Sequence, residues 1–244
     1  MIECNLVGRA GNQMFEYAMC RTLGEAKGFD WCINPAQWVC NDLFNLSFGG
    51  RGGEPITKEY HETILEYDPR IWDIEDGTLI NGYFQSEQYF DNAKARKWFK
   101  LYPDGEATII TEKYPIDEYC YINLRGTDVK ELGCQKLSLD YYRNAIEVIH
   151  TIKPDLNFIV ITDDIPFGKE YFPDFPVMSN TVRTDFCALN RAKYVILADS
   201  SFAWWAAWLN QNNTVIAPHG WLNVNINKWL FAPKDIKVNR WIWV

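Results

Sequence analysis

The chain has 244 residues, a mass of 28.5 kDa and a formal net charge of −8. This length is enough for two α/β domains of about 100 to 150 residues each. The acidic balance argues against nucleic acid or anionic membrane as the main partner, because both demand a basic face. The sequence shows no classical signal peptide and no transmembrane run of about 18 apolar residues. Seven cysteines without a C-x-x-C pair favour reduced thiols in a cytoplasm, and the alternative is a single disulfide.

The first part of the chain opens with a predicted strand, turn and helix. Apolar residues indicate a strand over Ile2 to Val7 and a helix over Gln13 to Lys27, joined by the glycine-bearing turn Gly8 to Asn12. From Asp30 to about Asp76 the sequence is irregular and rich in Gly and Pro. We expect a surface excursion there.

The middle of the chain carries a second strand and helix, followed by a crossing. Thr78 to Gln85 is predicted to be a strand and Glu87 to Phe99 a helix. Leu101 to Asp117 is expected to connect two lobes. Strands that alternate with helices in this way are typical of βαβ units and a parallel sheet.

The second half repeats this alternation more clearly. Four apolar runs are predicted strands: Tyr119–Leu124, Leu156–Thr162, Tyr194–Ala198 and Thr214–Ala217. The predicted helices are Leu139–Ile152 with Ser138 as its cap, Thr184–Ala192, and a helix from Ser200 onward. In the last helix Trp204, Trp205 and Trp208 share one face, which favours core packing over stacking on a sugar.

Polar side chains follow three of these strands at the point where each strand ends. They are Arg125 with Asp128, Asp163 with Asp164, and Ser200 with Ser201. If the strands are parallel, all three pairs open toward one crevice at the carboxyl edge of the sheet. The donors of an arginine suit a diphosphate, and a helix amino terminus at Ser200 favours an anion. The alternatives are a surface ion pair of Arg125 with Asp128 and an ordinary helix cap at Ser200.

Several segments resemble, in order, those of the family 11 glycosyltransferases, the α-1,2-fucosyltransferases. Residues 8–18, GRAGNQMFEYA, resemble the family's G-x-x-G-N-Q-M-F-Q-Y-A opening, and residues 82–90, GYFQSEQYF, resemble its G-Y-F-Q-S-E-K-Y-F segment. Residues 162–165, TDDI, resemble its S-D-D-I, and residues 200–210, SSFAWWAAWLN, its S-S-F-S-W-W-A-A-W-L-N, followed by Val215 to Pro218. These collinear matches run from residue 8 to about residue 222.

The resemblance implies an α/β fold of the GT-B-like kind, with two Rossmann-like lobes and the donor cleft between them. Residues 1–115 would form the acceptor-side lobe, and residues 116–244 the lobe that binds the nucleotide sugar. The implied reaction is an inverting, metal-independent transfer of fucose from GDP-fucose to a hydroxyl of a glycan acceptor, the 2-OH of a galactoside. The expected partners are thus a GDP-sugar and an oligosaccharide, with no cofactor. We expect this reaction in the cytoplasm, or at the periphery of the membrane where glycan precursors are assembled.

The resemblance also assigns roles to single residues. Arg125 falls on the first arginine of the family's H-x-R-R-G-D and would neutralise the departing diphosphate. The implied donor-binding residues of the second lobe are Asp163, Asp164, Asp185, Ser200 and Ser201. Those that would reach the donor from the first lobe are Gly8, Arg9, Gly11 and Asn12.

The chemistry of the transfer agrees with these assignments. Breaking the anomeric bond leaves charge on GDP, so the leaving group needs fixed positive charge, which Arg125, serine hydroxyls and a helix terminus would supply. A contiguous Asp163-Asp164 pair alternates across a strand and cannot easily chelate a metal through both side chains. Single displacement also needs a carboxylate to accept the proton of the acceptor, for which Asp128 and Glu131 are the candidates. The alternative role of Asp128 is to orient Arg125, and the alternative for Glu131 is a solvated position in a loop.

The sequence departs from the family at H-x-R-R-G-D. Here the histidine is Asn123 and the second arginine is Gly126. Losing one guanidinium removes a possible charge-assisted contact worth about 1.5 to 3 kcal/mol, which Arg9 is a candidate to replace. Three functions therefore stay open: a fucosyltransferase, a transferase of another GDP-sugar, and a non-catalytic relative that binds a GDP-sugar or glycan.

Overall fold

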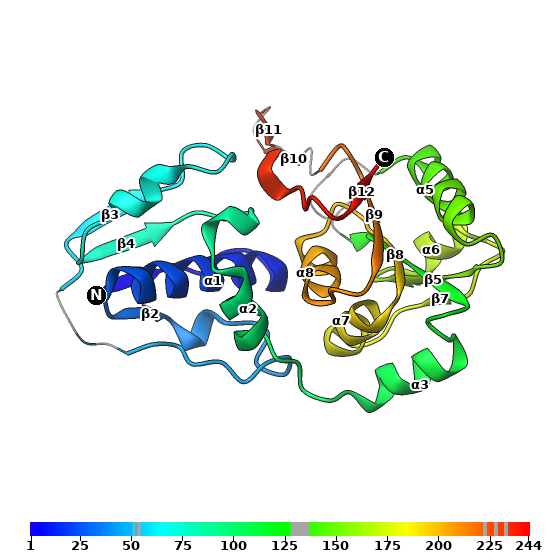
Figure 1. Ribbon diagram of the computed structural model, residues 1–244, viewed down its shortest axis with the longest axis horizontal. Helices are drawn as coiled ribbons and strands as arrows, with labels where there is room; N and C mark the ends of the chain where they lie inside the picture. The colour runs from blue at the N-terminus through cyan, green and yellow to red at the C-terminus, as the bar shows by residue number, and fades with distance from the viewer. Residues whose placement is uncertain (51, 53–54, 128–136, 222–223, 227–228, 232–233) are drawn as a thin grey trace. The chain divides into compact units, whose positions relative to one another are not determined.

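The computed structural model describes residues 1–244 except 51, 53, 54, 128–136, 222, 223, 227, 228, 232 and 233. The chain divides into two compact units, whose elements are labelled in Figure 1. The first unit comprises Met1–Tyr102 and Pro233–Val238, and the second comprises Pro103–Ala232 and Asn239–Val244. None of the helices described has the length and apolar content that a bilayer-spanning segment requires.

The first unit is built on a parallel sheet with the strand order β2-β1-β4-β3. The strands are β1 Ile2–Cys4, β2 Trp31–Ile33, β3 Lys58–His61 and β4 Thr78–Asn81. The helices are α1 Ala10–Lys27 and α2 Asn92–Trp98, with short 3-10 helices η1 Pro35–Gln37, η2 Pro69–Asp73, η3 Glu87–Tyr89 and η4 Lys234–Ile236.

The prediction of a surface excursion from Asp30 to Asp76 is wrong, because this segment contributes the strands β2 and β3 to the sheet. β2 has three residues, too few for a pattern to show. β3 is an edge strand whose exposed residues include Lys58, Glu59 and His61, so it lacks the apolar alternation of a half-buried strand. The predicted helix from Glu87 is instead η3 followed by α2, because the Asp91 carboxylate caps α2 by accepting the N–H groups of Ala93 and Lys94.

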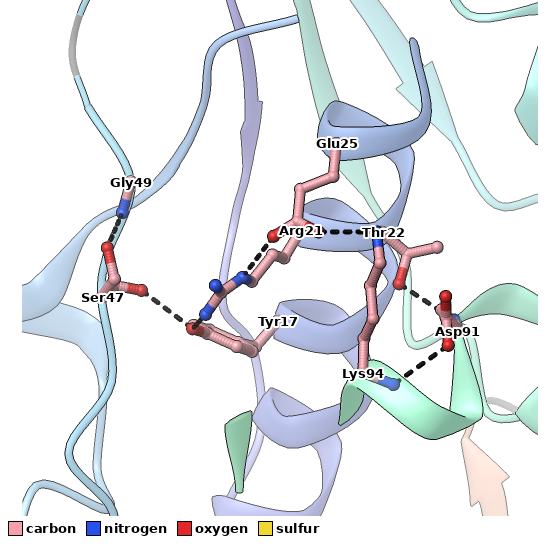
Figure 2. A network of polar contacts seen from close by, with 8 residues as sticks. All are labelled: Tyr17, Arg21, Thr22, Glu25, Ser47, Gly49, Asp91 and Lys94. Carbon is pink, nitrogen blue, oxygen red and sulfur yellow. Dashed lines mark hydrogen bonds and ion pairs between the residues drawn. The ribbon is translucent and has the colours of Figure 1, made fainter. Parts of the chain in front are cut away.

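α1 is buried over most of its length and carries a polar network on one side (Figure 2). Arg21 donates from Nη1 to the Tyr17 hydroxyl at 2.9 Å and from Nε to Glu25 at 2.8 Å. The Tyr17 hydroxyl donates to the Ser47 carbonyl at 2.9 Å, and Lys94 of α2 pairs with Glu25 at 2.9 Å. This network ties α1 to the loop after β2 and to α2.

The second unit contains a parallel sheet with the order β12-β9-β8-β5-β6-β7. Its strands are β5 Tyr119–Leu124, β6 Asn157–Thr162, β7 Val177–Met178, β8 Tyr194–Ile196, β9 Thr214–Ala217 and β12 Ile242–Trp243. A separate hairpin joins β10 Val224–Ile226 to β11 Trp229–Phe231. In chain order the sheet reads 3-2-1-4-5-6, the Rossmann order, whose topological switch point lies between β5 and β8.

Helices cover both faces of this sheet (Figure 1). They are α5 Leu139–Ile152, α6 Ile165–Tyr171, α7 Val182–Arg191 and α8 Ser201–Leu209, while α3 Gly105–Lys113 lies on α7. One face of β5, with Cys120, Ile122 and Leu124, packs against apolar residues of α5 and α6. Trp204, Trp205 and Trp208 of α8 are fully buried, which confirms their predicted core role.

The crossing from Leu101 to Asp117 contains α3, which was not predicted. α3 packs on α7, where Thr184 Oγ1 donates to Glu106 at 3.0 Å and Arg191 Nη1 donates to Thr108 at 2.8 Å. Arg183 of α7 also pairs with Asp104, the cap of α3, at 3.1 Å. The compact second unit therefore starts at Pro103. The donor and acceptor roles predicted for residues 116–244 and 1–115 remain predictions.

Candidate active site

The switch point of the second sheet brings Arg125 and Ser200 together. Arg125 directly follows β5, and Ser200 follows β8 as the cap of α8. Arg125 Nη1 donates to Ser200 Oγ at 3.0 Å, and the same oxygen accepts the Ala203 N–H at 3.4 Å. Ser200 is thus an ordinary helix cap and an arginine partner at once. Ser201 is the first residue of α8, where the helix terminus favours an anion.

The loop after β5 is held by Asp163, which follows β6. The exposed Asp163 carboxylate accepts the N–H groups of Gly126 at 2.7 Å and Thr127 at 3.3 Å. Its neighbour Asp164 instead caps α6 by accepting the Phe167 N–H at 3.0 Å. The two adjacent aspartates therefore serve different segments, since the Asp163 carboxylate accepts N–H groups of the loop that follows Arg125 and the Asp164 carboxylate caps α6.

Gly126, the residue at the position of the family's second arginine, fills a place without room for a side chain. A Cβ there would lie 2.6 Å from the Asp164 Cβ and 2.8 Å from a ring carbon of Phe167. Real Cβ atoms do not approach other atoms so closely, so any larger residue would displace the start of α6. The close packing of Gly126 against the start of α6 therefore leaves no space for the family's second arginine.

Asp185 lies in the first turn of α7 and is held by Asn180. The Asn180 side chain donates to Asp185 Oδ1 at 2.7 Å, and the Asn180 N–H donates to Oδ2 at 3.4 Å. Burial raises the pKa of Asp185 to about 6, and the charge of Asp163 acts in the same direction. Asn180 was not among the predicted site residues, and an isolated Asn before a helix offers no signal for this role.

Asn123, where the family has histidine, lies on the same face of β5 as Arg125 because side chains alternate along a strand. It is 6 % exposed, and its Oδ1 is buried without a hydrogen-bond partner among the described residues. A buried amide oxygen without a partner costs free energy unless a water or ligand supplies a donor.

In the first unit, the predicted turn residues surround the start of α1. Gly8 has φ +71°, and a Cβ there would lie 2.4 Å from Asn12 Nδ2, so this position requires glycine. The helix begins at Ala10, so Gly11 and Asn12 belong to its first turn, and the exposed Arg9 provides no side-chain cap. The turn predicted over Gly8 to Asn12 is thus shorter than expected.

Two glutamines from the family-like segments hold this turn and were not predicted as site residues. Gln85 donates from Nε2 to Asn12 Oδ1 at 2.8 Å. Gln13 Nε2 donates to the Gly8 carbonyl at 3.5 Å and to the Gln37 carbonyl at 2.9 Å, and Gln13 Oε1 accepts the Val39 N–H at 3.0 Å. Their presence inside the two matched segments was the signal that could have identified them.

A buried acid lies under the same turn. Glu16 is fully buried, its Oε2 accepts the Val7 N–H at 3.0 Å, and its Oε1 has no hydrogen-bond partner among the described residues. Burial raises the pKa of Glu16 to about 9, and the charge of Glu62 adds to the effect. Glu16 stands where the family-like pattern has glutamine, and a neutral carboxyl has nearly the shape of a carboxamide.

The predicted bases Asp128 and Glu131 lie outside the described residues. Within the described part of the chain, no group of three or more His, Cys, Asp or Glu side chains is placed to hold a metal ion. The independence from metal and the identity of the base therefore remain predictions.

The strand order of the second sheet defines a Rossmann-type unit. Most of the chain is similar in structure to solved fucosyltransferases. NodZ from Bradyrhizobium has a TM-score of 0.57 at 13% identity, over 84% of this chain and 91% of that one. POFUT1 in complex with GDP has a TM-score of 0.53 at 12% identity, over 88% and 97% of the two chains. These likenesses confirm the predicted α/β, GT-B-like fold class.

The sequence comparison points to the same family as the motifs. Residues 128–244 match the model of Glycosyl transferase family 11, which confirms the resemblance carried by the motifs over this part of the chain. The Escherichia coli O-antigen biosynthesis glycosyltransferase WbnK is 31% identical over 98 residues, 36% of this chain and 32% of WbnK. The E. coli alpha-1,2-colitosyltransferase is 29% identical over 158 residues, 57% and 54% of the two chains. The matched regions thus span about a third and about half of these relatives.

Proposed function

We propose that this protein is an inverting, metal-independent glycosyltransferase. It transfers fucose from GDP-fucose to a hydroxyl, the 2-OH of a galactoside, in a glycan acceptor. The observation that carries the proposal is the 3.0 Å contact between Arg125 Nη1 and Ser200 Oγ across the switch point of a Rossmann-ordered sheet. Ligands of such sheets bind at this place, and guanidinium and hydroxyl donors beside a helix terminus suit a diphosphate.

In this mechanism Arg125, Ser200, Ser201 and the amino terminus of α8 stabilise the charge that develops on GDP as the anomeric bond breaks. Asp163 holds the loop after Arg125 through the Gly126 N–H, 2.7 Å away. Asp185 accepts N–H donors of the guanine, and Gly8, Arg9, Gly11 and Asn12 supply donor contacts from the first unit. Asp128 or Glu131 accepts the proton of the acceptor hydroxyl. No cofactor takes part.

A second candidate is the transfer of a different sugar from its GDP derivative. The match to the alpha-1,2-colitosyltransferase over 57% of this chain favours it, since colitose is the sugar that this relative's name gives. A non-catalytic protein that binds a GDP-sugar is the further alternative, motivated by Gly126 in place of an arginine. We also propose a cytoplasmic location, supported by the buried free thiols of Cys4, Cys20, Cys32, Cys40, Cys120 and Cys187.

Calorimetric titration tests the donor site. GDP, GDP-fucose and GDP-mannose are titrated into the protein in EDTA and then with magnesium. We expect binding of GDP-fucose in EDTA, and a Kd about ten- to a hundredfold higher for Arg125→Ala, since a charge-assisted hydrogen bond contributes about 1.5 to 3 kcal/mol. The control is Arg143→Ala, an exposed arginine of α5. Equal affinities of both variants would contradict the proposal.

Release of GDP separates the remaining candidates. An enzyme slowly hydrolyses its donor without an acceptor, so GDP should accumulate from the GDP-sugar it uses and stop accumulating in Arg125→Ala. Release from GDP-colitose but not GDP-fucose would select the second candidate. Tight binding of a GDP-sugar without any release or transfer would select the non-catalytic one.

A further inference from the structure

The chain makes an unusual turn where β4 ends in the first unit. Gly82 has φ +157° and Phe84 has φ +50°, and Phe84 is the non-glycine residue with positive φ among those described. The Glu62 carboxylate, which follows β3, accepts the Tyr83 N–H at 2.7 Å and the Phe84 N–H at 3.1 Å. A Cβ at Gly82 would lie 2.4 Å from the Glu62 Cβ, so the glycine lets Glu62 reach these amides.

This turn buries one aromatic ring and exposes its neighbour. Phe84 is fully buried and packs on Tyr60 and Tyr89, with ring centroids 6.4 and 5.3 Å apart. Tyr83, one residue earlier, is 38% exposed. A left-handed conformation is strained at a bulky residue, and such strain concentrates at ligand-binding positions. Here the strained residue Phe84 directly follows the exposed Tyr83.

Tyr83 lies at the carboxyl edge of a parallel sheet, where ligands of open α/β folds bind. Gln85, two residues further, holds the α1 turn through Asn12 at 2.8 Å. Two other exposed apolar side chains follow neighbouring strands at this edge, Val7 after β1 and Ile64 after β3, each 41% exposed. The edge thus presents an exposed aromatic ring together with two exposed apolar side chains.

We propose that Tyr83 binds the glycan acceptor by stacking on the apolar C–H face of a pyranose ring, and that Glu62 is the positioning residue that holds Tyr83 in place. This inference rests on the proposed function and specifies its acceptor site. A pyranose is uncharged, with hydroxyls around its rim and C–H groups on its faces. An exposed aromatic ring with a hydroxyl at its tip matches that chemistry, whereas the guanidinium at Arg125 suits an anion.

The test measures binding of sugars to the free protein and to its GDP complex. Saturation-transfer difference NMR gives the Kd for methyl β-galactoside, methyl β-glucoside, methyl α-mannoside and lactose, and calorimetry gives the Kd for GDP. Tyr83→Ala should raise the Kd of the sugar that binds by about three- to tenfold, as expected for loss of one stacking contact. Tyr83→Phe, which keeps the ring, should bind the sugar as the wild type does. GDP affinity should stay the same in both variants.

Tyr102 offers a matched control, since it belongs to the same unit and is also 38% exposed. Tyr102→Ala should leave the sugar Kd unchanged. Equal sugar affinities of Tyr83→Ala and the wild type would overturn the proposal, and so would the failure of all four sugars to bind the wild type. Failure of GDP to bind would instead contradict the proposed donor site, while the sugar titrations would still report on Tyr83.

Glu62→Gln tests the positioning role. An amide in place of the carboxylate has one acceptor oxygen, so it cannot accept from two N–H groups through separate oxygens. We expect a higher sugar Kd or acceptor KM with unchanged GDP affinity and unchanged rate of donor hydrolysis. A loss of GDP binding in parallel with sugar binding would indicate a general structural role and contradict the assignment of Glu62.

Discussion

The carboxyl edges of the two sheets follow the same rule of topology but are finished in different ways. In the second unit, helices α6, α7 and α8 begin at this edge with side-chain caps from Asp164, Thr181 and Ser200. In the first unit α1 begins at Ala10 without a side-chain cap, and the loop after β4 carries Phe84 with positive φ. The second edge has a guanidinium and carboxylates beside helix termini. The first edge has the exposed Arg9 and Tyr83, the Glu62 carboxylate that holds the turn at Tyr83, and the buried acid Glu16.

This difference teaches that a shared fold does not fix what an edge can bind. Fixed charge and helix termini at the second edge suit a phosphorylated nucleotide. The exposed ring of Tyr83 at the first edge suits the C–H face of a neutral sugar. At the second edge the motif carries one arginine, Arg125, where the family has two. The packing between Gly126 and α6 leaves no space for the second one.

The largest effect is expected from forcing the absent arginine into the second edge. Gly126→Arg should destabilise the protein by about 3 kcal/mol, because its Cβ would meet Asp164 and Phe167 at 2.6 and 2.8 Å. Chemical denaturation measures the change. Gly105→Ala is the control, since nothing lies within 4 Å of a Cβ there and alanine favours the helix. A Gly126→Arg protein as stable as the wild type, with tighter GDP binding, would show that the second edge accepts a further cation.

A smaller effect, dependent on pH, is expected at the first edge. The folded protein keeps Glu16 neutral because burial raises its pKa to about 9, whereas in the unfolded chain the group ionises near its ordinary value of 4.5. The unfolded state therefore binds fewer protons between these values, and the wild type loses stability as pH rises through this range. Glu16→Gln does not titrate, so its advantage should grow by about 1 kcal/mol per pH unit.

Denaturation of both proteins at pH 6 and pH 8 checks this prediction. Glu25→Gln is the control on the same helix, because Glu25 pairs with Arg21 and Lys94 near the surface. Its difference from the wild type should not grow in favour of the variant as pH rises. A constant difference for Glu16→Gln would mean that Glu16 is ionised in the folded protein.

The smallest effect concerns Asp185. If its carboxylate accepts guanine N–H groups, GDP binding requires the ionised form, and the pKa of about 6 makes binding weaker below that pH. The Kd at pH 5 should be about tenfold above its value at pH 7.5. Asp185→Asn should bind GDP more weakly at pH 7.5. Its GDP affinity should also lose the pH dependence that comes from Asp185 and keep the part that comes from titration of GDP itself. Identical pH profiles of GDP affinity for the wild type and Asp185→Asn would mean that Asp185 only holds Asn180 and does not bind guanine.

The sequence predicted best those elements that have a strong local signal. β5 has the predicted bounds Tyr119–Leu124, and α5 has the predicted bounds Leu139–Ile152 with Ser138 as cap. The cap at Ser200 and the tryptophans of α8 are also as predicted. A long apolar run and a hydroxyl cap each determine local structure with little help from the rest of the chain.

The elements that were missed depend on tertiary contacts. β12 has two residues and exists as a strand because β9 pairs with it. α6 begins at Ile165 after its cap Asp164, which the sequence pattern indicated only as one of a pair of aspartates near the donor. The start of α1 lacked a capping side chain, so its first turn was predicted as a loop.

For the candidate site, too, one part was predicted from the sequence and another part was missed. The neighbourhood of Arg125 and Ser200 followed from strand ends in a parallel sheet, and the structure shows it. The roles of Gln85 and Glu62 rest on contacts with residues far along the chain, and Gln85 offered no signal besides its place in a matched segment. Asn180 contacts Asp185 five residues later, but a single Asn before a helix is too common to indicate this role.

The division of the chain into units has a consequence for its synthesis. Residues 234–238 belong to the first unit, where Asp235 accepts the Tyr67 N–H at 2.7 Å and Lys234 pairs with Glu66 at 2.6 Å. A ribosome makes these residues only after the strands β5 to β9 of the second unit. The first unit therefore completes its packing last, although its sheet emerges first. A fragment ending at Tyr102 would lack that segment, and folding intermediates on the ribosome should carry an unfinished first unit.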